Sequence, residues 1–388
     1  MTFGSLPSLP QPLRRDVLFA LRAVTQACAL AEKARKAGDF WTHKKLDGSQ
    51  VTSVDFVVQA MFAQFLDGSY PRDSLVAEED SGTLQSNPKG LRDAKRIFQQ
   101  YAGGGEEIIS SIDRGQGEPA DRFWVLDPID ATASFILGGQ YAVNCALVTG
   151  EEVSIGVLGC PRLQLPGKFY AESEGLLFLA IRDHGAWWAP LGSEDSFQRL
   201  KVSGRKTLKT SVPILAPRIN RDGLCDVDQS LIEGLFWALK PARRPIFAPS
   251  PVRYVLLAAG LGDFCYKIVF CEDPPSETAY VWDHAPGSLL VEEAGGVVTH
   301  LTGEPLDLTQ RCTWMDWDDG IVASNGYLHR VAFQAHEDAS LYEVHRPYGF
   351  GPYPHFLSGG RSQRSLNSQD LWNLMSQEKN PNIRTPSR

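Results

Sequence analysis

The segment Asp127-Pro128-Ile129-Asp130 limits what this chain can fold into more than any other, because it places two carboxylates at the end of an apolar run. The preceding residues 123–126 predict a short buried strand, and Pro128 enforces a turn after it. A turn that points Asp127, the Ile129 carbonyl and Asp130 the same way offers three oxygen ligands to a hard cation such as Mg²⁺. The alternative is an ordinary turn in which Asp130 caps a helix, and for this motif alone that outcome is the commoner one.

The composition excludes several classes of protein. With 388 residues, of which 43% are hydrophobic, the chain is long enough for one large two-lobed domain or for two domains. The net charge of −8, without a cluster of Lys and Arg, argues against a nucleic-acid polymer as partner, but a small anion held through a metal is compatible with it. Seven scattered cysteines indicate a reducing compartment, and neither a secretory signal nor a membrane span of about 18 apolar residues is predicted. We therefore expect a cytoplasmic protein that does not bind a membrane. The sequence does not indicate its oligomeric state.

Two helices are predicted near the start of the chain. Apolar periodicity predicts a long amphipathic helix over residues 14–36 and a second helix that runs from Ser53, its expected N-cap, to residue 65. Asp55 then lies in the first turn of the second helix. A carboxylate in that position more often only complements the helix dipole.

A short strand over residues 74–77 ends directly at Glu78. This lead-in places the Glu78 carboxylate at the carboxyl edge of a sheet, where open α/β sheets keep their sites, although a run of acids is more often a solvated loop. The polar, glycine-rich residues 81–121 predict a mobile excursion before the central strand.

The second half of the chain predicts antiparallel strands followed by a further α/β segment. The expected strands span residues 141–149, 153–158, 176–181, 186–189, 264–270, 297–299 and 320–324. The expected helices span residues 227–239, 252–261, 288–294 and 327–335. Asp283 projects from the start of the third of these helices, with Pro286 suited to its first turn and the glycine pair at 295–296 to its end.

Five carboxylates thus stand at the ends of predicted elements, and each by itself has an ordinary structural explanation: Asp55, Glu78, Asp127, Asp130 and Asp283. If they converge, they form a metal cluster, and metal-assisted hydrolysis of a phosphate ester is the chemistry that such a cluster serves best. Asp55 together with Thr132 would orient and deprotonate the attacking water. No Cys or His spacing indicates zinc, and no P-loop, nucleophile elbow or dinucleotide fingerprint is present.

Three motifs of this chain resemble the signatures of the Mg²⁺-dependent, lithium-sensitive inositol monophosphatase superfamily. They are Ala77-Glu78-Glu79, Leu126-Asp127-Pro128-Ile129-Asp130-x-Thr132 and Trp282-Asp283-His284-Ala285. Within the superfamily the chain is most similar to the 3′(2′),5′-bisphosphate nucleotidases. That similarity rests on three further motifs: Val51-Thr52-x-x-Asp55, residues 138–143, and Glu293-Ala294-Gly295-Gly296. The resemblance covers roughly residues 12–335 in the expected order.

The resemblance implies a layered α/β/α/β/α sandwich and hydrolysis of adenosine 3′,5′-bisphosphate, or its 5′-phosphosulfate form, to AMP and phosphate in sulfur assimilation. It implies that Glu78, Asp127, the Ile129 carbonyl, Asp130 and Asp283 bind Mg²⁺, at about two or three ions per site. It assigns water activation to Asp55 and Thr132, and substrate contacts to Thr132 and, with a looser match, to Ser250, Arg253 and Lys267, which are equally well explained as ordinary polar residues. The expected divisions are an N-terminal lead (1–13), an α+β lobe with the metal site (14–160), an α/β lobe with the substrate contacts (161–336) and a polar tail (337–388).

The chain departs from the family pattern around the predicted phosphate site. The family has Gly where this chain has Ala131, and an alanine there costs about 1 kcal/mol or more if the position requires a positive φ. Ala133-Ser134 replace a basic residue and a glycine, and no histidine lies between His184 and His284, where the nucleotidases have one that helps to hold the nucleotide. These departures favour two alternatives: a phosphatase of an inositol phosphate or another small phosphate ester, or a degenerate binding or regulatory protein that keeps the fold and the metal.

Overall fold

The computed structural model describes residues 9–46, 48–103, 107–165, 175–193, 196–215, 218–219, 225–226, 245–268, 278–314 and 320–334. The predicted helix over 227–239 and the predicted tail from residue 337 lie outside these residues. Among the helices of the part that is described, none is long and apolar enough to cross a membrane.

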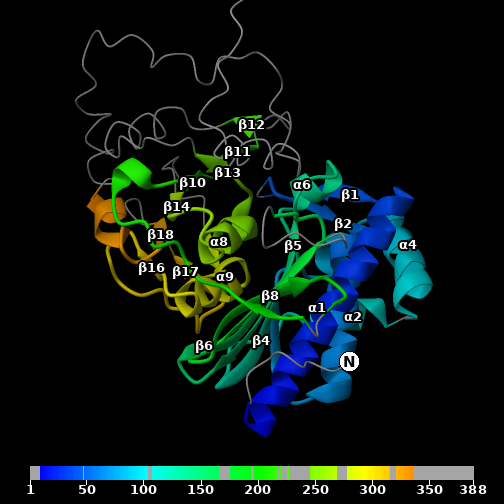
Figure 1. The fold of residues 1–388 in the computed structure, drawn as a ribbon. Coiled ribbons are helices and arrows are strands. Elements are labelled where there is room, and N and C mark those ends of the chain that lie inside the picture. The colour runs from blue at the N-terminus through cyan, green and yellow to red at the C-terminus, as the bar shows by residue number, and fades with distance from the viewer. Residues whose placement is uncertain are drawn as a thin grey trace, which may run out of the picture.

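A seven-stranded sheet forms the centre of the fold (Figure 1). In spatial order its strands are β3 (Ser74–Ala77), β4 (Arg122–Asp130), β5 (Ala142–Thr149), β6 (Glu152–Cys160), β7 (Leu176–Ile181), β8 (Gly185–Pro190) and β9 (Gln198–Arg199). β3 and β4 are parallel, and the pairs that follow are antiparallel. The sheet continues past residue 160 to β9, and the expected division of the chain at that residue stays a prediction.

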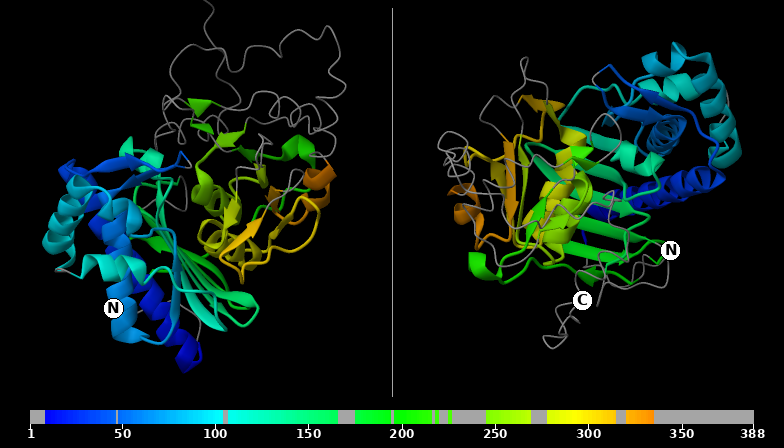
Figure 2. Two further views of the ribbon diagram at one scale, coloured as in Figure 1. Left: turned by 180° about the vertical axis from the view of Figure 1, so that it is seen from behind. Right: turned by 90° about the horizontal axis from the view of Figure 1, so that it is seen from above.

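Helices cover both faces of this sheet, which is why most residues of its inner strands are apolar and buried. On one face lie α1 (Gln11–Ala37) and α2 (Ser53–Ser69), and on the other lie α8 (Ser250–Ala258) and α9 (Val281–Glu293) (Figure 2). A second, five-stranded sheet packs on the far side of α8 and α9, so that this helix pair lies between the two sheets.

The second sheet has the order β13 (Ile246–Phe247), β10 (Pro213–Leu215), β14 (Phe264–Ile268), β18 (Gly320–Ser324) and β16 (Val297–His300). Its outer face packs on Leu328 and Ala332, beside and within the short helical stretch 329–334. The layers therefore alternate as helices, sheet, helices, sheet and helix, which confirms the predicted α/β/α/β/α sandwich. Three small ribbons hold the remaining described strands: β1 (Thr42–Lys44) with β2 (Gln50–Thr52), β11 (Arg218–Ile219) with β12 (Cys225–Asp226), and β15 (Thr278–Tyr280) with β17 (Cys312–Trp314). A 3₁₀ turn, η3 (Leu208–Thr210), precedes β10.

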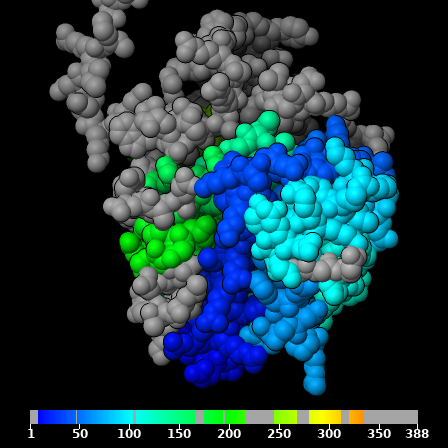
Figure 3. All heavy atoms as spheres, turned by 90° about the vertical axis from the view of Figure 1, so that its right-hand side faces the viewer, coloured from blue at the N-terminus to red at the C-terminus, as the bar shows by residue number. Residues whose placement is uncertain are grey.

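The prediction of a mobile excursion over residues 81–121 is wrong for the described part of that segment, and residues 104–106 lie outside it. The segment forms α3 (Gly82–Gln85), α4 (Pro88–Ile97), the π-helical turn η1 (Phe98–Ala102) and α5 (Ile108–Asp113), which cover α2 and form part of the outer surface shown in cyan in Figure 3. The apolar residues that fix these helices are few and separated by polar ones. Leu84, Ile97 and Phe98 are nevertheless buried at 0–1% exposure, and Asn87 caps α4 by accepting a hydrogen bond from the Gly90 amide.

Several helix starts differ from the predicted positions, among them that of α8, which begins at Ser250 and not at residue 252. α1 begins at Gln11, because Pro12 is well suited to a first helical turn. The N-cap of α2 is Thr52 and not Ser53, since the Thr52 hydroxyl accepts from the Val54 amide. α9 begins at Val281 instead of residue 288, so that Pro286 lies inside the helix and not in its first turn.

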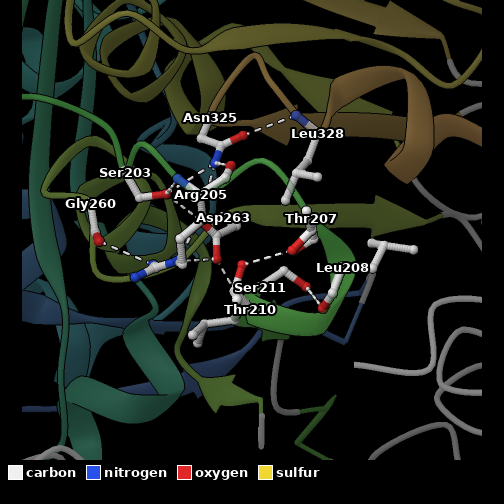
Figure 4. Close-up of polar contacts among 11 residues, drawn as sticks. Ser203, Arg205, Thr207, Leu208, Thr210, Ser211, Gly260, Asp263, Asn325 and Leu328 are labelled. Atoms are coloured by element: carbon white, nitrogen blue, oxygen red, sulfur yellow. Dashed lines mark hydrogen bonds and ion pairs between the residues drawn. The ribbon is translucent and has the colours of Figure 1, made fainter. Parts of the chain in front are cut away.

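A fully buried carboxylate joins the segments that lead into the second sheet. Asp263, with 0% exposure, precedes β14 and accepts hydrogen bonds from Arg205 Nε (2.7 Å), the Val212 amide (2.6 Å) and Asn325 Nδ2 (3.1 Å), as well as from the Ser203 hydroxyl (Figure 4). Asn325 follows β18, and Val212 leads into β10. One side chain therefore fixes three neighbouring strands at the same end of the sheet.

Replacing Asp263 by Ala is expected to lower the free energy of unfolding by about 3–5 kcal/mol, because it leaves Arg205 Nε and the Val212 amide without their acceptor. Denaturation by urea measures the change. Asp39, which is 83% exposed and pairs with Arg96 at 3.3 Å, provides the control, and Asp39→Ala should change stability by less than about 1 kcal/mol. An equal effect of the two substitutions would contradict the role assigned to Asp263.

Candidate metal centre

Three carboxylates from two distant parts of the chain meet at one end of the central sheet. Asp127 and Asp130 lie in β4, Asp283 lies in the first turn of α9, and one oxygen of each lies within 4.8 Å of the others. The strand does not stop at residue 126 as predicted. β4 continues through Asp130, with an irregularity in its pairing with β5 between Asp127 and Asp130 that takes the place of the predicted turn.

Backbone and side-chain donors hold the two β4 carboxylates. The Ile129 amide donates to Asp127 Oδ1 at 3.0 Å, and Asn144 Nδ2 donates to Asp130 Oδ2 at 2.8 Å. Asn144 is paired with Asp127 in the β4–β5 register and is missing from the predicted site. Its signal was available, because it is the one amide in the otherwise apolar and buried strand β5.

The electrostatics of the cluster call for a cation. Burial raises the pKa of Asp127, and the charges of Glu78, Asp130 and Asp283 raise it further. Burial and the charge of Asp283 likewise raise the pKa of Asp130, against the hydrogen bond from Asn144 and the charge of Arg253. Carboxylates this close remain ionised only when positive charge lies among them, and an all-oxygen donor set suits a hard divalent ion. The residues present therefore fit a divalent metal.

Asp55 and Thr132 lie beside this cluster and contact each other. The Thr132 hydroxyl lies 3.2 Å from Asp55 Oδ1 and 2.9 Å from the Ile129 carbonyl, so it can donate to either. Asp55 also accepts from the Thr52 amide at 3.0 Å, which makes it a capping residue as well. Burial raises the pKa of Asp55 to about 7, with the charge of Glu78 acting in the same direction and the Thr52 hydrogen bonds opposing it.

Glu78 stands next to the three-carboxylate cluster and is paired with Lys45, which lies outside the predicted site. Lys45 Nζ lies 3.1 Å from Glu78 Oε1 and 2.7 Å from Glu79 Oε1. Burial by itself would lower the pKa of Lys45, but the charges of Glu79 and Glu78 raise it above its ordinary value. Nothing in the local sequence indicates this pairing, because the β1–β2 ribbon that carries Lys45 meets Glu78 only in the tertiary structure.

Apart from Thr132, which contacts Asp55, the residues with predicted substrate contacts lie on the side of α9 and the second sheet. Lys267, in β14, has its Nζ 3.8 Å from Asp283 Oδ2, and Ser250 begins α8 one helical turn before Arg253. Arg253 is buried, donates through one terminal nitrogen to the Tyr266 carbonyl, and has no partner for its Nε among the described residues. The structure thus brings Lys267 next to the carboxylates and places Arg253 where its charge reaches Asp130.

Ala131 has the left-handed conformation, with φ 69° and ψ 49°. It links Asp130 to Thr132, which begins the short helix α6 (Thr132–Ile136). A left-handed alanine is strained by about 1–2 kcal/mol, because its Cβ approaches the following carbonyl oxygen. Residue 131 therefore has the positive φ at which the sequence analysis expects an alanine to be costly.

Replacing Ala131 by Gly is expected to raise the free energy of unfolding by up to about 1 kcal/mol, since the relief of strain exceeds the entropy that glycine loses on folding. Ala133→Gly, two residues further along and inside α6, is the matched control and should lower stability by about 1 kcal/mol. Chemical denaturation of both variants measures the difference. A loss of stability in Ala131→Gly as large as in the control would contradict the strain.

Comparison with solved structures agrees with this fold. An IMPase from Thermotoga maritima is 20% identical with a TM-score of 0.57, matching 83% of this chain and 97% of that one. The inositol monophosphatase from Anabaena is 19% identical with a TM-score of 0.52, matching 84% of this chain and 96% of that one. These likenesses confirm the fold predicted from the sequence.

Sequence relatives extend the agreement. A 3′(2′),5′-bisphosphate nucleotidase from Emericella nidulans is 30% identical over 337 residues, and the match covers 80% of this chain and 94% of the relative. A 3′,5′-bisphosphate nucleotidase from Arabidopsis thaliana is 32% identical over 357 residues, covering 81% and 93%. Residues 14–340 match the inositol monophosphatase family, and the chain belongs to that family as a metal-dependent phosphomonoesterase that is similar to bisphosphate nucleotidases.

Proposed function

We propose that this protein is a Mg²⁺-dependent 3′(2′),5′-bisphosphate nucleotidase that converts adenosine 3′,5′-bisphosphate, and its 5′-phosphosulfate form, to AMP and phosphate. The observation that carries the proposal is the meeting of Asp127, Asp130 and Asp283 within 4.8 Å in a chain whose similar relatives are named bisphosphate nucleotidases. A cytoplasmic location, a place in sulfur assimilation and inhibition by Li⁺ belong to the same proposal.

Each site residue has a proposed role. Glu78, Asp127, the Ile129 carbonyl, Asp130 and Asp283 would hold the Mg²⁺ ions, about two or three per site, and bound Mg²⁺ would supply neutralisation of phosphate charge and a more acidic water. Asp55 would accept a proton from the attacking water, and its hydrogen bond with Thr132 would orient that water. Thr132, Ser250, Arg253 and Lys267 would contact the substrate.

A second candidate is a phosphatase of an inositol phosphate or another small ester, and the strained Ala131 favours it, because the altered turn lies directly after Asp130. The strained Ala131 also favours a non-enzymatic alternative, a degenerate member of the family that binds or regulates without turnover. If strain at Ala131 has impaired turnover, Ala131→Gly should raise the rate strongly, whereas an unchanged or lower rate would place the alanine in a working site.

The test is phosphate release in the presence of Mg²⁺ from adenosine 3′,5′-bisphosphate, measured beside inositol monophosphate, with and without Li⁺. Faster release from the nucleotide, lost in Asp127→Asn, would support the nucleotidase. A preference for inositol monophosphate would replace the proposed substrate. No release from either, by protein that is folded and binds Mg²⁺, would support the non-catalytic alternative.

A further inference from the structure

His284 lies buried between two polar side chains from different elements. It follows Asp283 in the first turn of α9 and is 1% exposed. Its Nδ1 lies 2.8 Å from the hydroxyl of Tyr254 in α8, and its Nε2 lies 3.3 Å from Lys267 Nζ in β14. Both ring nitrogens of this histidine therefore have a partner, and the partners come from two other elements, α8 and β14.

The protonation of this chain of contacts follows from the chemistry of its members. An ammonium group only donates hydrogen bonds, so the His284 Nε2 that faces Lys267 is the unprotonated acceptor. Nδ1 then carries the proton and donates to the Tyr254 oxygen.

The same ammonium group lies near a carboxylate of the metal centre without closing on it. Lys267 Nζ is 3.8 Å from Asp283 Oδ2, longer than a direct charge-assisted hydrogen bond of about 2.8 Å. An unrestrained lysine beside a carboxylate would close this distance and compete with any other cation for the oxygen. The hydrogen bond to His284 Nε2 gives the Lys267 ammonium group a second partner that restrains it.

We propose that His284 is a positioning residue that holds the Lys267 ammonium beside Asp283, where it contacts the phosphate of the substrate instead of closing on the carboxylate. Tyr254 fixes the ring of His284 in the orientation that this requires. The inference rests on the proposed function in one respect: it takes the ligand next to Asp283 to be a phosphate. It does not depend on whether that phosphate belongs to a nucleotide.

Two substitutions distinguish the roles of the two ring nitrogens of His284. The side-chain amide of Gln can place an oxygen near the position of Nε2 and so keep an acceptor for Lys267, whereas the shorter Asn reaches only the position of Nδ1 and keeps the contact with Tyr254. If His284 acts through Lys267, His284→Asn should weaken binding about tenfold and His284→Gln should recover most of the loss. A purely structural histidine would show no such order.

The measurement is calorimetric binding of inorganic phosphate in the presence of Mg²⁺ to the full chain, with thermal melting of every variant to establish folding. In Lys267→Met, which should itself weaken phosphate binding about tenfold or more, adding His284→Asn should weaken it no further, because the group that His284 positions is already absent. Additive losses, or equal losses for the Asn and Gln variants, would overturn the inference. Failure of saturable phosphate binding to the unaltered protein would overturn it as well.

Hydrolysis of adenosine 3′,5′-bisphosphate by the same variants keeps the two proposals apart. If the unaltered protein binds phosphate but does not hydrolyse the nucleotide, the nucleotidase proposal fails and the order of the His284 variants in phosphate binding still decides the role of His284. If it hydrolyses the nucleotide, the positioning role predicts that His284→Asn raises KM more than it lowers kcat, since the lysine contact is made in the bound substrate too.

Discussion

Replacing Asp127 by Asn should lower kcat for phosphate release by about 10³-fold or more while the protein remains folded. The amide has nearly the shape of the carboxylate and can still accept the hydrogen bond from the Ile129 amide, but it removes one negative charge from a cluster whose oxygens lie within 4.8 Å of one another. The expected cause of the loss is weaker metal binding, which calorimetric titration with Mg²⁺ measures independently of turnover.

The same substitution should stabilise the protein when no metal is present. Asp127 is 2% exposed, and its pKa is raised by burial and by three neighbouring carboxylates, so its ionised form is unfavourable in the folded state at neutral pH. In EDTA at pH 7.5, Asp127→Asn should therefore melt at a higher temperature than the unaltered protein, and added Mg²⁺ should raise its Tm less.

Asp121→Asn is the matched control, because Asp121 is an exposed acid just before the other end of the same strand. It should change neither the rate nor the response to Mg²⁺. Full activity in Asp127→Asn, or a lower Tm in EDTA combined with unchanged Mg²⁺ affinity, would show that Asp127 is not part of a metal centre.

Replacing Asp55 by Asn should lower kcat by about 10²–10⁴-fold, the usual contribution of a general base. The asparagine oxygen can still accept from the Thr52 amide, so the cap of α2 is retained and the loss isolates the proton-accepting role. Thr132→Val, which removes the hydroxyl 3.2 Å from Asp55, should lower kcat as well, but Thr132→Ser should not.

The stability of the metal-free protein should show the raised pKa of Asp55. The pKa of Asp55 is about 7 in the folded protein, above the value near 4 in an unfolded chain. The stability that the protonated carboxyl contributes is therefore fully present below pH 4 and is lost as the pH rises through 7, because ionisation is less favourable in the folded state. Asp55→Asn should therefore gain stability over the unaltered protein at pH 8 and lose that gain at pH 5. Urea denaturation in EDTA at the two pH values measures this, and a gain that is independent of pH would contradict the assignment.

Much of the fold could be predicted from local pattern. The sequence predicts the apolar strands β4, β5 and β7 and the long periodic helix α1. Their hydrophobic patterns require burial whatever the packing partner is, so they can be recognised without knowledge of the fold. Residues 82–113 were misjudged, since their helices are short and are held by a few apolar side chains against α2. Short helices are formed mainly by tertiary packing, and their own sequence signal is correspondingly weak.

The candidate site divides in the same way. The acidic residues at the ends of β3 and β4 and at the start of α9 could be identified from the sequence, because carboxylates that directly follow apolar runs are visible without any knowledge of the fold. The pairing of Lys45 with Glu78 and Glu79, and the place of His284 between Tyr254 and Lys267, follow from tertiary packing alone. These partners are 17 to 34 residues apart in sequence, and the contacts depend on how helices and sheets pack. The left-handed conformation of Ala131 also depends on the tertiary structure, because an alanine adopts it only where the surrounding contacts outweigh its strain.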